Sequence, residues 1–250
     1  MFRYTLESDI GRKREVNEDQ AAVLRRPDGL FLGIVADGMG GHNAGDLASR
    51  MAAEELGRLF MEEEETAFLS AEAKKDWLLQ SVKQINRQVY NHALLNPACS
   101  GMGTTLLAAI VSRDDCVLCH IGDSRAYVFD GTARQITRDH TYVNLLVDTG
   151  ELSQAEAEDH PKKHLIIRAL GTEPDIEGDL LEVELTASLC LLLCSDGLSN
   201  KLSEAEIAAV LHGELPLAEK GNELIRRANE LGGEDNISFV LFCADEEVKR

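Results

Sequence analysis

The sequence has little positive charge and no long apolar run, and each absence excludes a class of function. Its 250 residues include 25 lysines and arginines against 44 aspartates and glutamates, which gives a formal net charge of -19. A nucleic-acid-binding protein needs a basic surface to displace counterions, and docking on an anionic membrane needs one as well. The longest apolar runs, at 105–111 and 189–194, are too short to span a bilayer. We therefore expect neither nucleic acid nor a membrane as a partner.

The sequence also lacks a targeting segment and a zinc pattern. Its first residues, MFRYTLESDIGRKRE, have no apolar core of the kind that signal peptides carry. Cys116 and Cys119 have CxxC spacing, but no second pair or histidine cluster completes a zinc site. Buried core thiols are the favoured interpretation, and a metal or redox pair is the alternative. Reduced thiols favour the cytoplasm as the location.

What the chain does have is a clear alternation between strand and helix patterns. Apolar residues at helical spacing predict two long helices over 44–60 and 78–93, a capping box opens another helix at Ser203, and a last helix ends near residue 232. No repeat, low-complexity tract or linker interrupts the pattern, so we expect a single domain over 1–250. Short apolar or alternating stretches predict strands at 20–24, 30–36, 104–111, 116–121, 125–129, 180–185, 189–194 and 237–243. Strands joined by short turns, with helices inserted in pairs, predict an α+β fold of layered antiparallel sheets.

Carboxylates gather at the ends of these predicted strands. Asp37, Asp123 and Asp196 directly follow apolar strands, and Asp19 and Asp235 directly precede them. A single aspartate in such a place is usually a turn cap. Five that converge at one end of a sheet would repel one another unless a cation held them. Because the ligands would all be oxygens, the pattern favours magnesium or manganese over zinc.

Six motifs carry a family resemblance. They are SDIGRKREVNED at 8–19, VADGMGGH at 35–42, GMGTTL at 101–106, IGDSRAY at 121–127, CSDGLSN at 194–200 and EDNIS at 234–238. In order and spacing they resemble the motifs of the metal-dependent Ser/Thr protein phosphatases of the 2C type. The polar segment 140–171, with HP at 160–161 and RALG at 168–171, is similar to the flap subdomain of their bacterial members.

The resemblance implies a fold and a metal centre. The fold would be a four-layer α-β-β-α sandwich, with two central antiparallel sheets, helix pairs outside and the metal centre at the sheet edge. Two ions, Mn²⁺ or Mg²⁺, would be bridged by Asp37. The resemblance also implies further metal ligands and supports: the Gly38 carbonyl, Asp196 and Asp235 as direct ligands, Glu18 and Asp19 acting directly or through water, Asp123 with Asp196 for a weaker third ion, and His42 and Asn236 behind the ligands.

Arg14 resembles the arginine that holds the substrate phosphate in this family. A planar, two-pronged donor suits a phosphate dianion better than lysine does. The alternative is a solvated charge in the basic run GRKR at 11–14. His42 could equally be a residue that begins a helix. In the flap segment, His140, His160 and Arg168 are interpreted as structural or close to the substrate rather than catalytic.

The implied reaction is hydrolysis of phosphoserine or phosphothreonine in proteins, by direct attack of a hydroxide that bridges the two metal ions. The enzyme would be a monomer that reverses the action of a bacterial Ser/Thr kinase. Met39 departs from the eukaryotic pattern, in which a histidine here is assigned as general acid, and a thioether cannot donate a proton. Two alternatives remain: a catalytically weak pseudophosphatase that binds phosphoproteins, and a regulatory phosphatase with a single substrate. Acidic residues at every expected metal position disfavour the first, and a chain with no room for a sensory domain disfavours the second.

Overall fold

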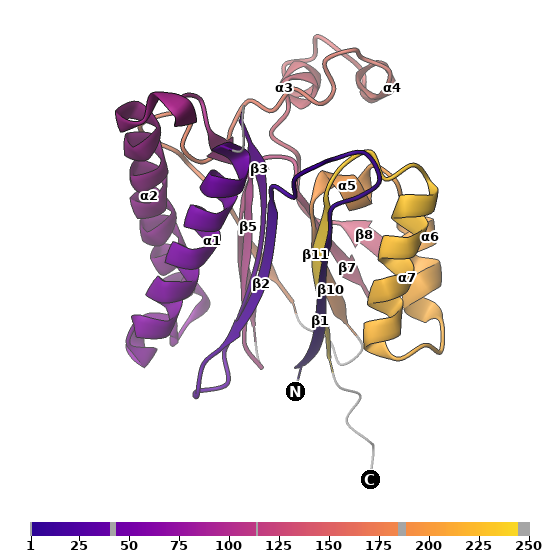
Figure 1. The fold of residues 1–250 in the computed structure, drawn as a ribbon. Helices are drawn as coiled ribbons and strands as arrows, with labels where there is room; N and C mark the ends of the chain where they lie inside the picture. The colour runs from indigo at the N-terminus through magenta and orange to yellow at the C-terminus, as the bar shows by residue number, and fades with distance from the viewer. Residues whose placement is uncertain (1, 41–43, 114, 185–188, 245–250) are drawn as a thin grey trace.

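Two antiparallel β-sheets face each other and helices cover their outer faces (Figure 1). The structure is a computed structural model that describes residues 2–40, 44–113, 115–184 and 189–244. One sheet has the strand order β1-β11-β10-β7-β8, and the other has the order β2-β3-β5-β6-β9, with β4 paired to β3. The predicted four-layer sandwich is therefore confirmed.

The elements of each layer come from separate parts of the chain. The first sheet consists of β1 (Phe2–Asp9), β7 (Arg125–Phe129), β8 (Ala133–Gln135), β10 (Cys190–Cys194) and β11 (Ile237–Ala244). The second consists of β2 (Asp19–Arg25), β3 (Phe31–Met39), β4 (Gly103–Thr104), β5 (Leu106–Val111), β6 (Cys116–Ile121) and β9 (Asp179–Val183). The helices are α1 (Ala44–Glu62) and α2 (Ala71–Leu95) on the second sheet, and α5 (Asp196–Ser199), α6 (Glu204–His212) and α7 (Leu217–Glu230) on the first. Beyond one edge of the sandwich lie α3 (Tyr142–Asp148) and α4 (Gln154–Glu158), and two 3-10 turns occupy Glu65–Phe68 and Pro97–Cys99.

Strand β5 shows why the sandwich has three apolar interfaces. Its six residues, LLAAIV, are all buried. Leu106 and Ile110 pack towards α1 and α2, whereas Leu107 and Val111 pack between the two sheets. Since successive side chains of a strand point to opposite faces, a continuous apolar strand must be covered on both sides. A third cluster fills the space between the first sheet and the helices α6 and α7.

Strand β1 was not predicted from the sequence. It pairs with β11 along its whole length, from Phe2 opposite Ala244 to Asp9 opposite Ile237. The strand lies at the edge of its sheet, so its side chains are a mixture of buried and exposed. Phe2 and Leu6 do alternate with polar residues, and they pack against the apolar layer between the sheets. This alternation is the signal that could have revealed the strand.

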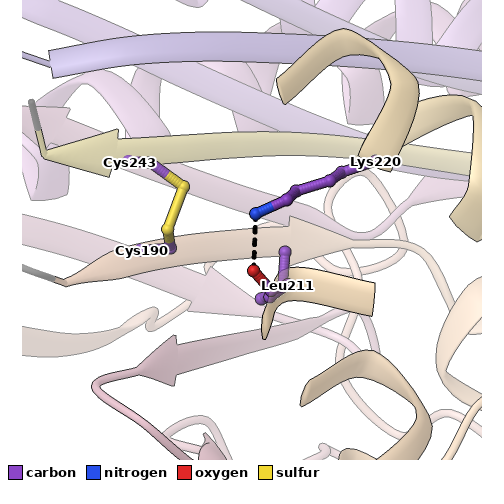
Figure 2. Close-up of a disulfide and its surroundings, with 4 residues drawn as sticks. All are labelled: Cys190, Leu211, Lys220 and Cys243. Atoms are coloured by element: carbon purple, nitrogen blue, oxygen red, sulfur yellow. Dashed lines mark hydrogen bonds between the residues drawn. A yellow bond between two sulfur atoms is a disulfide. The ribbon is translucent and has the colours of Figure 1, made fainter. Parts of the chain in front are cut away.

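The cysteines divide into two groups. Cys116 and Cys119 are buried free thiols, as predicted. Cys190 and Cys243, by contrast, lie opposite each other on β10 and β11 and form a disulfide. Figure 2 shows this pair beside Lys220 of α7, whose ammonium group donates to the Leu211 carbonyl at 2.6 Å. The expectation of reduced thiols is wrong for this pair, so cysteine usage gives no support for a reducing compartment.

The chain contains no candidate membrane span among its described helices, because none combines the necessary length with the necessary apolar character. This agrees with the short apolar runs of the sequence. The cytoplasmic location stays a prediction.

Candidate active site

The end of β3 forms the centre of the site, and hydrogen bonds fix its backbone. Asp37 lies opposite Asp19 in the β2–β3 pairing. The backbone N–H of Asp37 donates to the Thr105 hydroxyl at 2.9 Å, and the Thr105 N–H donates to the Asp37 carbonyl at 2.8 Å. Hydrogen bonds to Thr105 therefore fix both the N–H and the carbonyl of the residue that carries this carboxylate.

Gly38 is required by close packing rather than by an unusual backbone angle. A Cβ at this position would lie 2.1 Å from the carbonyl oxygen of Gly45, in the first turn of α1. A Cβ at Gly45 would in turn lie 2.5 Å from a carboxylate oxygen of Glu18. The two glycines thus let β3, α1 and the Glu18 side chain meet at one point. This explains the Asp-Gly sequence at the end of the strand.

Five of the carboxylates assigned from the sequence line one cleft of about 870 Å³. They come from five separate parts of the chain: Glu18 before β2, Asp37 in β3, Asp123 between β6 and β7, Asp196 at the start of α5, and Asp235 before β11. Gly38, Met39 and Arg14 also line the cleft. His42 lies outside the described residues.

Two of the residues assigned from the sequence lie behind this lining. Asp19 is buried, and its carboxylate accepts a hydrogen bond from the Ser195 hydroxyl at 2.7 Å, next to Asp196. Asn236 accepts the backbone N–H of Glu18 at 2.8 Å. Its amide also donates to two carbonyls of the loop that carries Arg14, at 3.0 Å each. Both residues therefore hold parts of the lining in place.

Three of the cleft carboxylates, Asp37, Asp123 and Asp196, and Asp19 behind them, resist ionisation in the absence of a cation. Burial raises the pKa of Asp123 to about 7, and the charges of Asp196 and Asp139 add to the effect. Burial also raises the pKa of Asp19 to about 7. Burial, followed by repulsion from neighbouring carboxylates, raises the pKa of Asp37 well above its usual range and raises that of Asp196. The positive charge near these clustered carboxylates is therefore too small to offset their burial and mutual repulsion.

The donor atoms fit hard divalent ions. One carboxylate oxygen of Asp123 and one of Asp196 are buried and have no hydrogen-bond partner among the described residues. All the cleft ligands are oxygens, which magnesium and manganese prefer. In the described chain, no three of these carboxylates bring one oxygen each within 4.8 Å of one another. Without an ion, the described carboxylates therefore do not form a tight cage for a single ion.

Arg14 provides positive charge at the edge of the cleft. Its guanidinium donates to the Asp235 carboxylate at 2.8 Å, and its side chain is 46% exposed. Burial alone would lower the pKa of Arg14, but the neighbouring carboxylates, Asp235 foremost, raise it. Arg14 therefore remains charged and can reach a ligand in the cleft.

Comparison with known proteins identifies the family. The family model described as protein phosphatase 2C matches residues 11–239. The serine/threonine phosphatase Stp of Listeria monocytogenes is 43% identical over 239 residues, which cover 95% of this chain and 94% of Stp. The chain belongs to the protein phosphatase 2C family. Members of this family are metal-dependent phosphoprotein phosphatases, so the chain is an enzyme of this class.

Solved structures of the family agree with the fold. The Streptococcus agalactiae serine/threonine phosphatase superimposes with a TM-score of 0.92 at 37% identity, covering 98% of this chain and all of the other. The catalytic domain of the phosphatase PstP, solved with two manganese ions, gives a TM-score of 0.82 at 37% identity, covering 98% and 99% of the two chains. The Streptococcus pneumoniae phosphatase PhpP is 36% identical over 97% of this phosphatase 2C chain and 98% of its own length.

Several residues around the cleft were not assigned from the sequence. Lys163 and His164 of the flap segment line it, as does Lys201. Lys201 pairs with Glu234, and the charge of His164 acts to lower the pKa of Asp196. No motif spacing marks these cations. Only the folding of the flap segment over the phosphatase 2C centre brings two of them to the cleft.

Proposed function

We propose that this chain hydrolyses phosphoserine and phosphothreonine in proteins, with two divalent ions, Mn²⁺ or Mg²⁺, in the carboxylate cleft. The observation that carries the proposal is the convergence of Glu18, Asp37, Asp123, Asp196 and Asp235 on one cleft. Two of them, Asp123 and Asp196, each have a buried oxygen without a hydrogen-bond partner in the described chain. The presence of two manganese ions in the related PstP structure supports the number of ions. The names of the relatives support the substrate class.

We assign the metal ligands as follows. Asp37 would bridge the two ions, with Asp196, Asp235 and the Gly38 carbonyl as further ligands. Glu18 would act directly or through water, with Asp19 and Asn236 behind the lining, and Asp123 with Asp196 would hold a weaker third ion. When bound, the ions would activate a water molecule for attack on phosphorus and neutralise charge on the phosphate. Their binding would also offset the mutual repulsion that the carboxylates experience in the metal-free protein.

Arg14 would bind the phosphate oxygens. It is held at the cleft by Asp235, but its half-exposed side chain is free to turn towards a substrate. Its planar fork offers two parallel donors to a phosphate dianion. Asp235 would then have two functions: metal ligand, and resting partner of Arg14. Met39 lines the cleft but has no proton to give, so the leaving alcohol takes its proton from another donor.

Residues 140–171 would form a flap subdomain within the single domain 1–250. Val143, Ala157 and Ile166 of this segment line the same cleft as the carboxylates. They offer apolar surface, whereas Lys163 offers positive charge and His164 offers an imidazole. The segment would therefore contact the protein part of a substrate, and shape the choice among phosphoproteins, while the carboxylates act on the phosphate. In the cell the enzyme would act as a monomer that reverses the action of a Ser/Thr kinase.

The proposal is tested with the purified protein and a phosphoserine and a phosphothreonine peptide. Phosphate release should stop in excess chelator and return when Mn²⁺ or Mg²⁺ is added back. Full turnover in excess chelator would contradict the metal-dependent reaction. Tight binding of the phosphopeptide without turnover at any metal concentration would instead identify a pseudophosphatase.

A further inference from the structure

His120, His140 and Asp179 form a cluster outside the cleft, at the base of the flap segment. One nitrogen or oxygen from each lies within 4.8 Å of the others, a spacing that would suit a metal ion. The hydrogen bonds of His140 argue against an ion. Its Nδ1 accepts the backbone N–H of Gly122 at 3.1 Å, so the neutral ring carries its proton on Nε2. This Nε2 lies 3.1 Å from a carboxylate oxygen of Asp179, which accepts its proton, and 3.2 Å from a guanidinium nitrogen of Arg168, which cannot accept one. With Nδ1 already accepting from Gly122, the ring has no lone pair left for a metal.

The carboxylate of Asp179 holds both ends of the flap segment. It accepts the Nε2–H of His140 at the first end and a guanidinium N–H of Arg168, at 2.9 Å, near the second. Burial alone would raise the pKa of Asp179, but the bond from His140 and the charge of Arg168 together lower it. Asp179 is therefore a carboxylate anion that accepts two hydrogen bonds, one from the His140 imidazole and one from the Arg168 guanidinium. It belongs to β9 and does not line the cleft.

His140 connects Asp179 to the cleft through its hydrogen bonds to Gly122. Besides the bond from Gly122 to its ring, its own backbone N–H donates to the Gly122 carbonyl at 2.7 Å, and its carbonyl accepts the N–H of Ile167 at 2.9 Å. Gly122 has a φ of +106°, and a Cβ there would lie 2.6 Å from the Thr105 side chain. The next residue is Asp123, whose carboxylate lines the cleft. The orientation of the imidazole therefore fixes the turn that presents Asp123.

His120 packs against His140 from the sheet side. The two rings are 4.7 Å apart between centroids and inclined at 32°. His120 is fully buried, and burial lowers its pKa to about 3 although the nearby carboxylate of Asp179 opposes the shift. Neither of its ring nitrogens makes a hydrogen bond of normal geometry within the described chain. His120 therefore serves as a neutral, flat wall that limits how the ring of His140 can turn.

We propose that Asp179 is a positioning residue for the phosphatase reaction: by fixing the ring of His140, it holds the Gly122–Asp123 turn and both ends of the flap segment around the cleft. The role in catalysis rests on the proposed function. The geometric part does not, because it concerns hydrogen bonds that exist without substrate or metal. Asp179 reaches the Gly122–Asp123 turn only through His140, since it does not itself line the cleft.

The kinetic test uses a double-mutant cycle on a phosphopeptide with saturating Mn²⁺. Asp179→Ala should lower kcat/KM roughly 10-fold, the lower range for loss of a hydrogen bond to a charged group. His140→Asn keeps an oxygen that can accept the Gly122 N–H but has no donor in place of Nε2. If Asp179 acts through His140, the double variant should be no slower than His140→Asn alone. Asp179→Asn, whose amide oxygen can still accept from His140, should recover part of the loss.

Asp175→Ala is the matched control. Asp175 lies four residues away, is 87% exposed and makes only a long pair with Arg87 at 3.7 Å, so its removal should leave kcat/KM and the melting temperature unchanged. Equal kinetics for Asp179→Ala and Asp175→Ala would overturn the proposal. So would effects of Asp179→Ala and His140→Asn that multiply in the double variant. If Asp179→Ala fails to fold, Asp179→Asn takes its place in the same cycle.

Hydrogen exchange separates failure of this inference from failure of the proposed function. In chelator-treated protein, Asp179→Ala should speed amide exchange at Gly122 and Ile167 several-fold over the wild type, and Asp175→Ala should not. Unchanged exchange at both amides would overturn the positioning role whatever the kinetics show. If the wild type hydrolyses no phosphopeptide, the proposed function fails, and the exchange rates still decide whether Asp179 holds the turn and the flap segment.

Discussion

Removing the carboxylate of Asp123 should stabilise the metal-free protein, increasingly so as the pH rises. Asp123 is 7% exposed, and burial with nearby acids raises its pKa from 3.8 to about 7. Between these two values the unfolded chain has released its proton and the folded chain has not. Folding then takes up a proton, so the free energy of unfolding falls as pH rises, by about 1.4 kcal/mol for each pH unit. Above pH 7 both states are ionised, and the penalty levels off at about 4 kcal/mol.

Asp123→Asn keeps the shape of the side chain and removes this penalty. In excess chelator, urea unfolding should show the variant more stable than the wild type by about 2 kcal/mol at pH 5 and about 4 kcal/mol at pH 8. The control is Asp76→Asn on the exposed face of α2, which should change stability little at either pH. Saturating Mn²⁺ should reduce or reverse this difference in the free energy of unfolding. The ion stabilises the folded state that it binds, and it binds the wild-type site more completely than the site of the variant. A variant that is less stable than the wild type at pH 8 in chelator would refute the reasoning.

Three further predictions concern separate parts of the molecule. Arg14→Ala should raise KM for a phosphopeptide while Mn²⁺ binding, followed by isothermal titration, stays intact; lost metal affinity would show that Arg14 serves the metal site instead. Replacing residues 150–159 of the flap segment with a short Gly/Ser linker should reduce turnover of a phosphoprotein far more than that of a small aryl phosphate, and an equal loss on both would contradict a role in substrate choice. Replacing Cys190 and Cys243 with serine should lower the free energy of unfolding by about 4 kcal/mol, from loss of a cross-link between residues 53 apart, with kcat unchanged because Asp196 lies at the other end of β10. An unchanged unfolding midpoint would mean that the disulfide adds no stability.

The sequence allowed the layers to be predicted because burial leaves a periodic record. The apolar runs of β5 and β10 predicted strands, the run in β10 indicated a strand covered on both faces, and the capping box at Ser203 marked the start of α6. Five candidate aspartates were predictable for a related reason: each directly precedes or follows a predicted apolar strand, whereas Glu18 and Gly38 were expected only from the family resemblance. The structure brings Asp37, Asp123 and Asp196 to one cleft, and their individual roles stay predictions.

Features that depend on register or on long-range packing could not be predicted. The disulfide requires Cys190 to lie opposite Cys243, and nothing in either apolar strand sets that register. Asp179 meets His140 only because β9 pairs with β6 at the base of the flap segment, where His120 lies opposite Asp179. Lys163 reaches the cleft through the fold of a polar segment that has no regular pattern. In each case the contact joins two segments of the chain, and neither segment carries a sequence motif that marks it.

The account depends most on Asp37 as the carboxylate that joins two metal ions to the reaction. Phosphate release from a phosphothreonine peptide, measured against Mn²⁺ concentration for the wild type and Asp37→Ala, tests this most directly. The wild type should be inactive in chelator and rise to a plateau with Mn²⁺, whereas Asp37→Ala should be slower by several orders of magnitude at every concentration of the ion. An Asp37→Ala variant that reaches the wild-type plateau at high Mn²⁺ would contradict the central claim.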